Sequence, residues 1–289
     1  MGKLFCKLFQ EPLNNTMRIF IILITLSLLT SCESNQEEDV MLDYLHVSHT
    51  RTDINPKLDS IIESINYSKY DVLMLGGDLA TLTSLDVNAM NHVDSVFNLS
   101  KPSTLWSLGW HDYTDLSLVE AFTKRKPYYS YYKNGITFIV IDTQDDFSKF
   151  SGEQKRMVDQ VLDTIQSSSH LILLHHKLIW MDDNATLAKR IPEISNANMD
   201  TCSYCINPNN FYSNVYPKLV TLSNAGTKVI CVGGDIGFKT KEFEYLTPEG
   251  IHFLASGIGN GSSDNKGLVF HHNVSMSNLT WEFKLTSEL

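Results

Sequence analysis

Several apolar runs in this chain end abruptly in glycine or in a polar side chain. The clearest are "DVLMLGGD" (71–78), "HLILLHH" (170–176) and "TKVICVGGD" (227–235). Runs of this length and composition are typical of β-strands buried on both faces. Open α/β sheets carry their binding sites just beyond the carboxyl ends of such strands. The pattern therefore predicts a layered α/β domain with polar side chains gathered at one edge.

The segments between these runs have helical spacing or turn residues. Residues 56–68, 85–98, 151–166 and 211–226 are expected to be helices, and "YYSYYKNGITFIVIDTQ" predicts a hairpin around Asn134-Gly135. Four β runs follow residue 240. Strands flanked by helices and closed by a β meander favour an α/β architecture in layers.

The N-terminus is expected to be an export signal. Residues 19–29 form an apolar run that is shorter than the about 20 residues needed to span a bilayer, and Arg18 precedes it. "LTSC" (29–32) resembles the processing site of a bacterial lipoprotein, which implies cleavage before Cys32 and lipidation of its thiol. Met17 is a second candidate start, and an ordinary cleaved signal or a short anchor is the alternative.

The segment after Cys32 is polar and acidic, so residues 33–41 are expected to be a tether rather than a folded element. Acidic residues at this place resemble the surface-export signals of Bacteroidota lipoproteins. The resemblance implies a lipid-anchored protein of the cell envelope, at the outer membrane or cell surface of a Gram-negative bacterium. The membrane is then a partner through the anchor.

The charge of the chain argues against nucleic acid as a general partner. The net charge is −10, and residues 1–31 carry three basic side chains and one acidic one, so their removal leaves −12. Binding to nucleic acid needs a basic surface. An anionic small substrate remains compatible with this charge, because a metal ion or one arginine can set the local field.

Three of the five cysteines lie beyond the signal: Cys202, Cys205 and Cys231. "CSYC" (202–205) lies in an Asn-rich stretch of an exported chain, which favours a local disulfide. A zinc knuckle would need a second CxxC pair, and the sequence has none.

Five strand ends carry the polar side chains: "VSHTR", "GGDL", "GWHD", "LLHHK" and "GGDIG". Together and in this order, over about residues 42–285, they resemble the calcineurin-like metallophosphoesterases, whose blocks read DxH, GD, GNH(D/E), H and GHxH. The resemblance implies an α/β fold built as a layered αββα sandwich. It assigns residues 42–289 to one domain, with an irregular insertion at 183–214.

Four positions match the family blocks. The resemblance implies that Asp78 bridges two metals and that His175 is the lone histidine ligand. It further implies that His111 contacts phosphate and protonates the leaving group, with Asp112 as its partner.

Five positions depart from the family blocks. His49 and Arg51 stand in place of the aspartate and histidine of DxH, and Trp110 replaces the metal-binding asparagine. Asp235 and Gly237 replace both histidines of GHxH. Arginine stays cationic, indole only donates, and glycine has no side chain, so these three positions supply no ligand.

The remaining ligands suffice for one divalent ion of the Mn, Fe, Zn or Mg class, if an ion is held at all. The candidate ligands are Asp78, His175 and Asp235, with His49 as a fourth. Three protein ligands plus water can hold a catalytic ion, whereas two rarely can. Arg51 could replace the other ion by gripping phosphate bidentately.

Two functions fit these residues. The first is an exported metal-dependent phosphoesterase with a reduced, one-metal site that hydrolyses a phosphate ester, small or polymeric. The second is an inactive surface lipoprotein that uses the same fold to bind a ligand. A serine or cysteine hydrolase is disfavoured because the sequence contains no GxSxG elbow.

Replacing Cys32 tests the lipoprotein hypothesis. Cys32→Ala removes the thiol that would carry the lipid, so we expect an unprocessed precursor that takes up no labelled fatty acid. Mass spectrometry of the N-terminus of both proteins measures this. Identical processing and location of the mutant and the wild type would contradict the hypothesis.

Overall fold

The computed structural model describes residues 39–289. The predicted signal, Cys32 and the tether as far as residue 38 lie outside the described residues. Between residues 39 and 289, no helix combines the length and the apolar character that a bilayer crossing requires.

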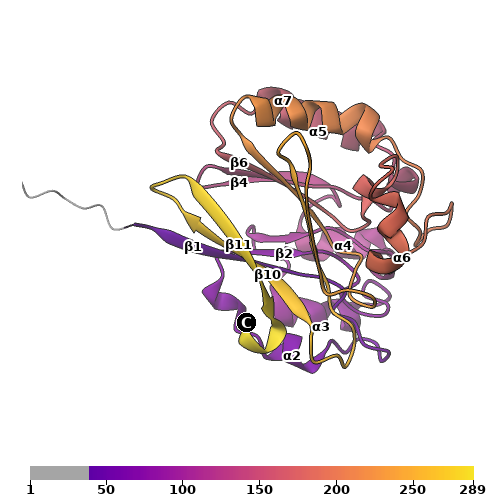
Figure 1. Ribbon diagram of the computed structural model, residues 1–289. Helices are drawn as coiled ribbons and strands as arrows, with labels where there is room; N and C mark the ends of the chain where they lie inside the picture. The colour runs from indigo at the N-terminus through magenta and orange to yellow at the C-terminus, as the bar shows by residue number, and fades with distance from the viewer. Residues whose placement is uncertain (1–38) are drawn as a thin grey trace, which may run out of the picture. The chain divides into compact units, whose positions relative to one another are not determined.

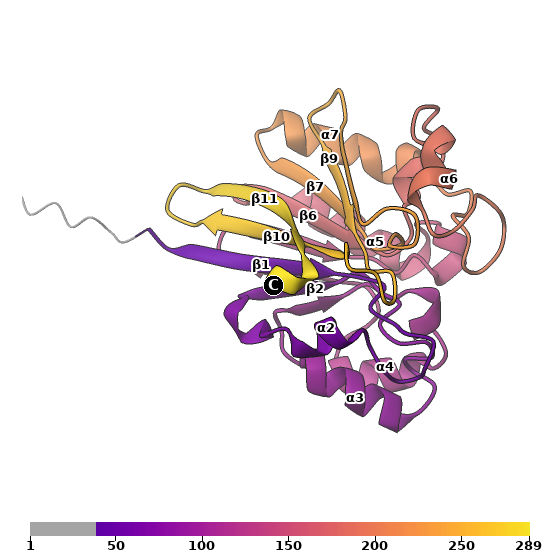
Figure 2. The same ribbon diagram turned by 60° about the horizontal axis from the view of Figure 1, so that its bottom comes forward.

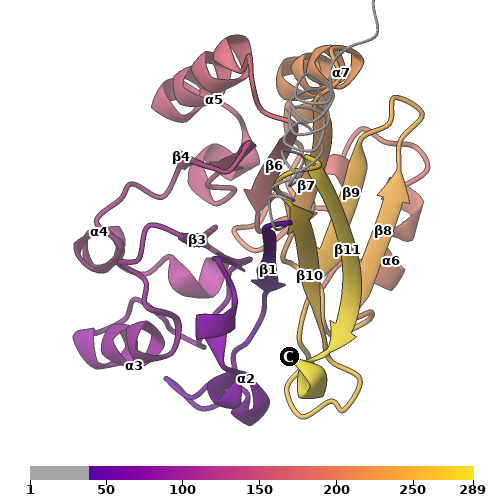
Figure 3. The ribbon, with the colours of Figure 1, turned by 90° about the vertical axis from the view of Figure 1, so that its left-hand side faces the viewer.

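Two mixed β-sheets form the centre of this unit. The five-stranded sheet has the order β11-β10-β1-β2-β3 and the six-stranded sheet the order β4-β5-β6-β7-β9-β8; Figure 3 shows β1, β10 and β11 side by side. The strands are β1 (Met41–Val47), β2 (Val72–Leu75), β3 (Thr104–Trp106), β4 (Tyr129–Lys133), β5 (Ile136–Val140), β6 (His170–His175), β7 (Lys228–Gly233), β8 (Glu242–Leu246), β9 (His252–Ser256), β10 (Lys266–Asn273) and β11 (Asn278–Leu285).

Helices cover the outer face of each sheet. In Figure 1, α5 and α7 lie along one side of the strands and α2 and α3 along the other, and Figure 2 shows α4 beside α3. The predicted αββα sandwich is therefore confirmed. The helices are α2 (Ser60–Ser64), α3 (Val87–Phe97), α4 (Leu116–Thr123), α5 (Gly152–Thr164), α6 (Ile191–Ile194) and α7 (Tyr216–Asn224).

Side chains that alternate along each strand fill separate cores. On β6, Ile172 and Leu174 pack between the two sheets, while Leu171 and Leu173 pack under the outer helices. Successive residues of a strand point to opposite faces, so a strand covered on both sides is apolar throughout. This explains the continuous apolar runs in the sequence.

Most predicted elements are present, and the hairpin around Asn134-Gly135 joins β4 to β5. The helix expected over residues 56–68 is wrong in extent, because it spans only Ser60–Ser64. The Asp59 side chain caps its start by accepting from Ile61 N, and Asn66 begins a separate 3₁₀ turn after it. The short helix α4 was not predicted.

The carboxyl ends of β1, β2, β3, β6 and β7 meet at one edge of the sandwich. Ser48 Oγ, just past β1, donates to Gly234 O, just past β7, at 2.6 Å. A Cβ atom on Gly234 would lie 1.9 Å from Gly76 O, so only glycine permits this approach. The loops that follow the two sheets are thereby held against each other.

Candidate active site

A cavity of about 240 Å³ opens where these strand ends meet. Five of the seven candidate site residues line it, together with histidine, amide and aromatic side chains that the sequence analysis did not select. The lining consists of His49, Arg51, Asp78, Trp110, His111, His176, Asn196, Ala197, Tyr204, Asp235 and Phe238.

Asp78 lies at the centre of the polar cluster. Its Oδ2 is 3.6 Å from His49 Nε2 and its Oδ1 is 3.8 Å from His176 Nε2. Its Oδ1 also accepts from His111 N at 3.0 Å. Asp78 and His49 both have left-handed backbones, with φ of 54° and 59°. Such conformations are costly for residues other than glycine and cluster at functional sites.

Two histidines direct Nε2 toward this carboxylate. His49 Nδ1 lies 3.2 Å from Ile258 O, and His176 Nδ1 lies 2.7 Å from Gly76 O. A carbonyl oxygen only accepts, so each Nδ1 carries a proton, and Nε2 is the nitrogen that has the lone pair whenever the ring is neutral. This is the arrangement that backbone carbonyl groups impose on metal-binding histidines.

The charges in the cluster stabilise one another. Burial raises the pKa of Asp78, but the neighbouring histidines, His176 foremost, outweigh it and hold that pKa below its ordinary value. Burial lowers the pKa of His49 to about 4 against the opposing effect of Asp78. Burial also lowers the pKa of His176, yet Asp78 and Asp235 together raise it. Asp78 is therefore ionised at neutral pH, and His49 is neutral.

The histidine predicted on β6 is corrected. His175 does not line the cavity; it points away, packs edge-on against Trp180 at 4.4 Å between ring centroids, and its Nδ1 donates to Lys177 O at 2.7 Å. His176 takes the place predicted for it. Ile172, Leu174 and His176 are alternate residues, and all three face the inner side of the sheet. Choosing the histidine one residue earlier therefore selects a side chain on the opposite face.

The role expected of Asp112 is also corrected. Its buried carboxylate accepts from Asp78 N at 2.7 Å, Gly109 N at 2.9 Å and Leu79 N at 3.0 Å. It thus ties the loop after β2 to the loop after β3, and it does not line the cavity.

His111 has a different partner from the one expected. Its Nδ1 donates to Thr81 O at 2.6 Å, so its Nε2 is the nitrogen left for chemistry in the cavity.

Arg51 enters the cavity without an acidic partner. Within residues 39–289 no carboxylate lies at ion-pair distance from its guanidinium group, and its buried Nε has no hydrogen-bond partner. The guanidinium lies 5.6 Å from the ring centroid of Phe238. An unpaired, oriented guanidinium in an acidic chain is suited to binding an anion.

The insertion at 183–214 folds against the site. Asn196 N donates to Asp235 O at 3.0 Å, and Phe238 N donates to Asn196 Oδ1 at 2.9 Å. Cys202 and Cys205 form the expected local disulfide.

Burial raises the pKa of Asp235, and its carboxylate has only a long contact of 3.4 Å with Ser195 Oγ.

Asp78, His176 and Asp235 are the side chains of the cavity that could serve as ligands of a divalent ion. Beside His176, Asp78 and Asp235 supply two carboxylates, and the separation of 3.8 Å is within the ~4 Å that two ligands ~2.1 Å from one ion can span. On the side of Asp78 that faces His49, the neighbouring Arg51 would repel a cation. Over residues 39–289, no three His, Cys, Asp or Glu side chains are already grouped around a common point.

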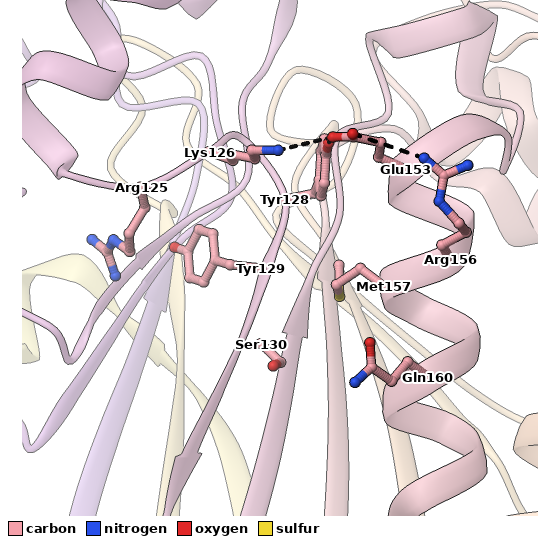
Figure 4. A pocket seen from close by; sticks show the side chains of 9 residues that line it. All are labelled: Arg125, Lys126, Tyr128, Tyr129, Ser130, Glu153, Arg156, Met157 and Gln160. Atoms are coloured by element: carbon pink, nitrogen blue, oxygen red, sulfur yellow. Dashed lines mark hydrogen bonds and ion pairs between the residues drawn. The ribbon is translucent and has the colours of Figure 1, made fainter.

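A larger cavity of about 500 Å³ lies elsewhere, between β4 and α5 (Figure 4). Its Lys126 and Arg156 are both paired with Glu153, as the dashed lines show. The Arg125 side chain donates to four backbone carbonyl groups. Its charged groups are thus already satisfied, and no histidine lines it, so the cavity around Asp78 is the candidate active site.

The fold matches solved structures of metallophosphoesterases. A dimetal phosphatase from Danio rerio has a TM-score of 0.55 and 8% identity, over 85% of this chain and 96% of that one. A 5′-nucleotidase precursor from Thermus thermophilus gives 0.44 and 12%, over 85% and 54%. The NAD nucleotidase of Haemophilus influenzae gives 0.40 and 15%, over 85% and 50%. No family model and no curated protein matches the sequence.

Removal of the Asp112 carboxylate tests its structural role. Asp112→Ala leaves three buried N–H groups without an acceptor, so we expect a loss of about 2 kcal/mol or more in the free energy of unfolding. Urea denaturation measures it. Asp53→Ala, at an exposed carboxylate without a hydrogen bond, should change it by less than about 0.5 kcal/mol. Equal stability of the two variants would contradict the role.

Proposed function

We propose that this chain is an exported phosphoesterase that hydrolyses a phosphate ester with one divalent ion. The observation that carries the proposal is that the Asp78–His176 cluster and Arg51, which has no acidic partner, line the same cavity. The cluster offers a cation its ligands, and the guanidinium offers a phosphate its partner. The metallophosphoesterase fold supports the same chemistry.

Asp78, His176 and Asp235 would hold the ion. A divalent ion bound there supplies Lewis-acid stabilisation of the phosphoryl charge. His176, whose pKa is raised in the protein without the ion, would give up its proton on binding, so the affinity for the ion should increase with pH.

The chain's own residues bind and protonate the ester. Arg51 would hold the non-bridging phosphate oxygens through its free N–H groups. Its stacking on Phe238 would restrict the guanidinium to one orientation. His111, fixed through Nδ1 by Thr81 O, would give a proton from Nε2 to the leaving oxygen.

A binding lipoprotein without turnover is the second candidate function. Two observations favour it: the described residues contain no preassembled group of three metal donors, and Trp110 and Gly237 stand where the family has ligands. Export and lipidation at Cys32 are proposed for both functions.

The pair of neighbouring histidines provides a test of the ion site. We expect elemental analysis of the metal-reloaded wild type to give at most one divalent ion per chain. His176→Ala should lower the bound ion to about a tenth or less, because it removes a ligand, whereas His175→Ala should keep it. Two ions per chain, or loss of the ion in His175→Ala alone, would overturn the assignment.

Arg51 provides a test of phosphate binding that is separate from the ion. Arg51→Ala should reduce kcat/KM for phosphate esters about 100-fold or more while the bound ion is retained, since it removes a charged, bidentate contact. Arg51→Lys should recover part of the rate. Unchanged kinetics in Arg51→Ala would exclude the arginine, and absence of turnover in the ion-loaded wild type on monoester and diester panels would favour the binding function.

A further inference from the structure

Exposed aromatic side chains gather around the mouth of the active-site cavity. Among the described residues, five large aromatic side chains are more than a third exposed, and four of these line this cavity or the one beside it. They are Trp110 (43%), Phe147 (55%), Tyr204 (59%) and Phe238 (55%). Large aromatic groups left in water at one place indicate a binding surface.

Trp110 separates two cavities. One is the active-site cavity, and the other, of about 340 Å³, is lined also by Tyr113, Phe147 and Ser203. The rings of Trp110 and Tyr204 meet at 68°, with their centroids 6.0 Å apart. The indole that replaces a family metal ligand is therefore a wall of the substrate space rather than part of the core.

The loop that carries Tyr204 is firmly held. The disulfide between Cys202 and Cys205 closes it, and the buried Asn207 side chain donates to Cys202 O at 2.7 Å. Asn207 Oδ1 in turn accepts from the buried Nζ of Lys177, next to the β6 strand end, at 2.8 Å. Tyr204 is thus presented from a braced loop, and a ligand need not order that loop on binding.

The side chains that line the mouth of the cavity suit a ligand with a planar aromatic ring. Beyond the charged cluster, the cavity offers aromatic faces and a single amide, Asn196, whose buried Nδ2 has no partner. A sugar alone would require several polar partners for its hydroxyl groups. A planar heterocycle requires π faces and one or two donors, and these are present.

We propose that Trp110, Tyr204 and Phe238 form a specificity subsite for the alcohol part of the ester, and that this part carries a planar aromatic ring of the nucleobase type. This inference rests on the proposed function for the phosphate end of the cavity. The ring packs against Trp110 and Tyr204 while the phosphate reaches Arg51.

Adenosine 5′-monophosphate and ribose 5-phosphate are a matched pair of probes. They share the phosphate and the primary alcohol that leaves, and differ only in the base. We expect the wild type to favour adenosine 5′-monophosphate, or another nucleoside 5′-monophosphate, over ribose 5-phosphate by about tenfold or more. The preference is measured as kcat/KM and, independently, as Kd by calorimetry.

Three variants test whether Trp110 and Tyr204 cause the preference for the nucleotide over ribose 5-phosphate. Trp110→Ala and Tyr204→Ala should each reduce the ratio between the two probes by about fivefold or more, and Trp110→Phe should restore part of it. Tyr132→Ala, at an equally exposed tyrosine on β4, should leave the ratio unchanged. Circular dichroism of each variant verifies that it is folded.

The outcomes separate this inference from the proposed function. Equal kcat/KM and Kd for ribose 5-phosphate and every nucleoside 5′-monophosphate would overturn the aromatic subsite and leave hydrolysis standing. Selective binding without turnover, lost in Trp110→Ala, would support the subsite and overturn hydrolysis. A preference that survives both alanine variants would overturn the assignment to Trp110 and Tyr204.

Discussion

The close contact between the loops after β2 and β7 is the constraint on which the site depends. Gly234 passes so near Gly76 O that a side chain at this position is excluded, and His176 Nδ1 donates to the same carbonyl oxygen. The two sheets are therefore joined by backbone at the edge where their strands end. Asp78 and Asp235, which belong to different sheets, can share one cavity for this reason. A side chain at position 234 would clash with the loop after β2 and push the two loops apart.

The strand-end blocks made most of the fold and part of the site predictable. Buried strands covered on both sides must be apolar throughout, and the polar residue that follows each run marks its end. Asp78, His111 and Asp235 could be selected by this signal alone, and all three line the cavity. The error at His175 arose because two adjacent histidines end one strand. Counting alternate residues from Leu174 would have selected His176.

Other parts of the site left no local signal in the sequence. Tyr204 and Asn196 lie in the insertion, whose path depends on contacts with residues far away in the chain, such as Asn196 N with Asp235 O. Asp112 was assigned to chemistry because its block resembles a catalytic one. Its carboxylate instead accepts backbone N–H groups of two loops, and such a role becomes visible only when the loops are folded together. For the same reason, the sequence alone does not show whether the Trp110 indole packs in the core or lines a cavity.

The direction of β1 has a consequence for access. This strand starts at Met41 and ends next to His49, so it runs the full depth of the sandwich, roughly 20 Å, toward the cavity. The amino end of the domain and the cavity mouth are thus at opposite ends of one straight, central strand. A substrate therefore enters at the end of the domain where β1 finishes, and the whole length of β1 separates that entrance from Met41.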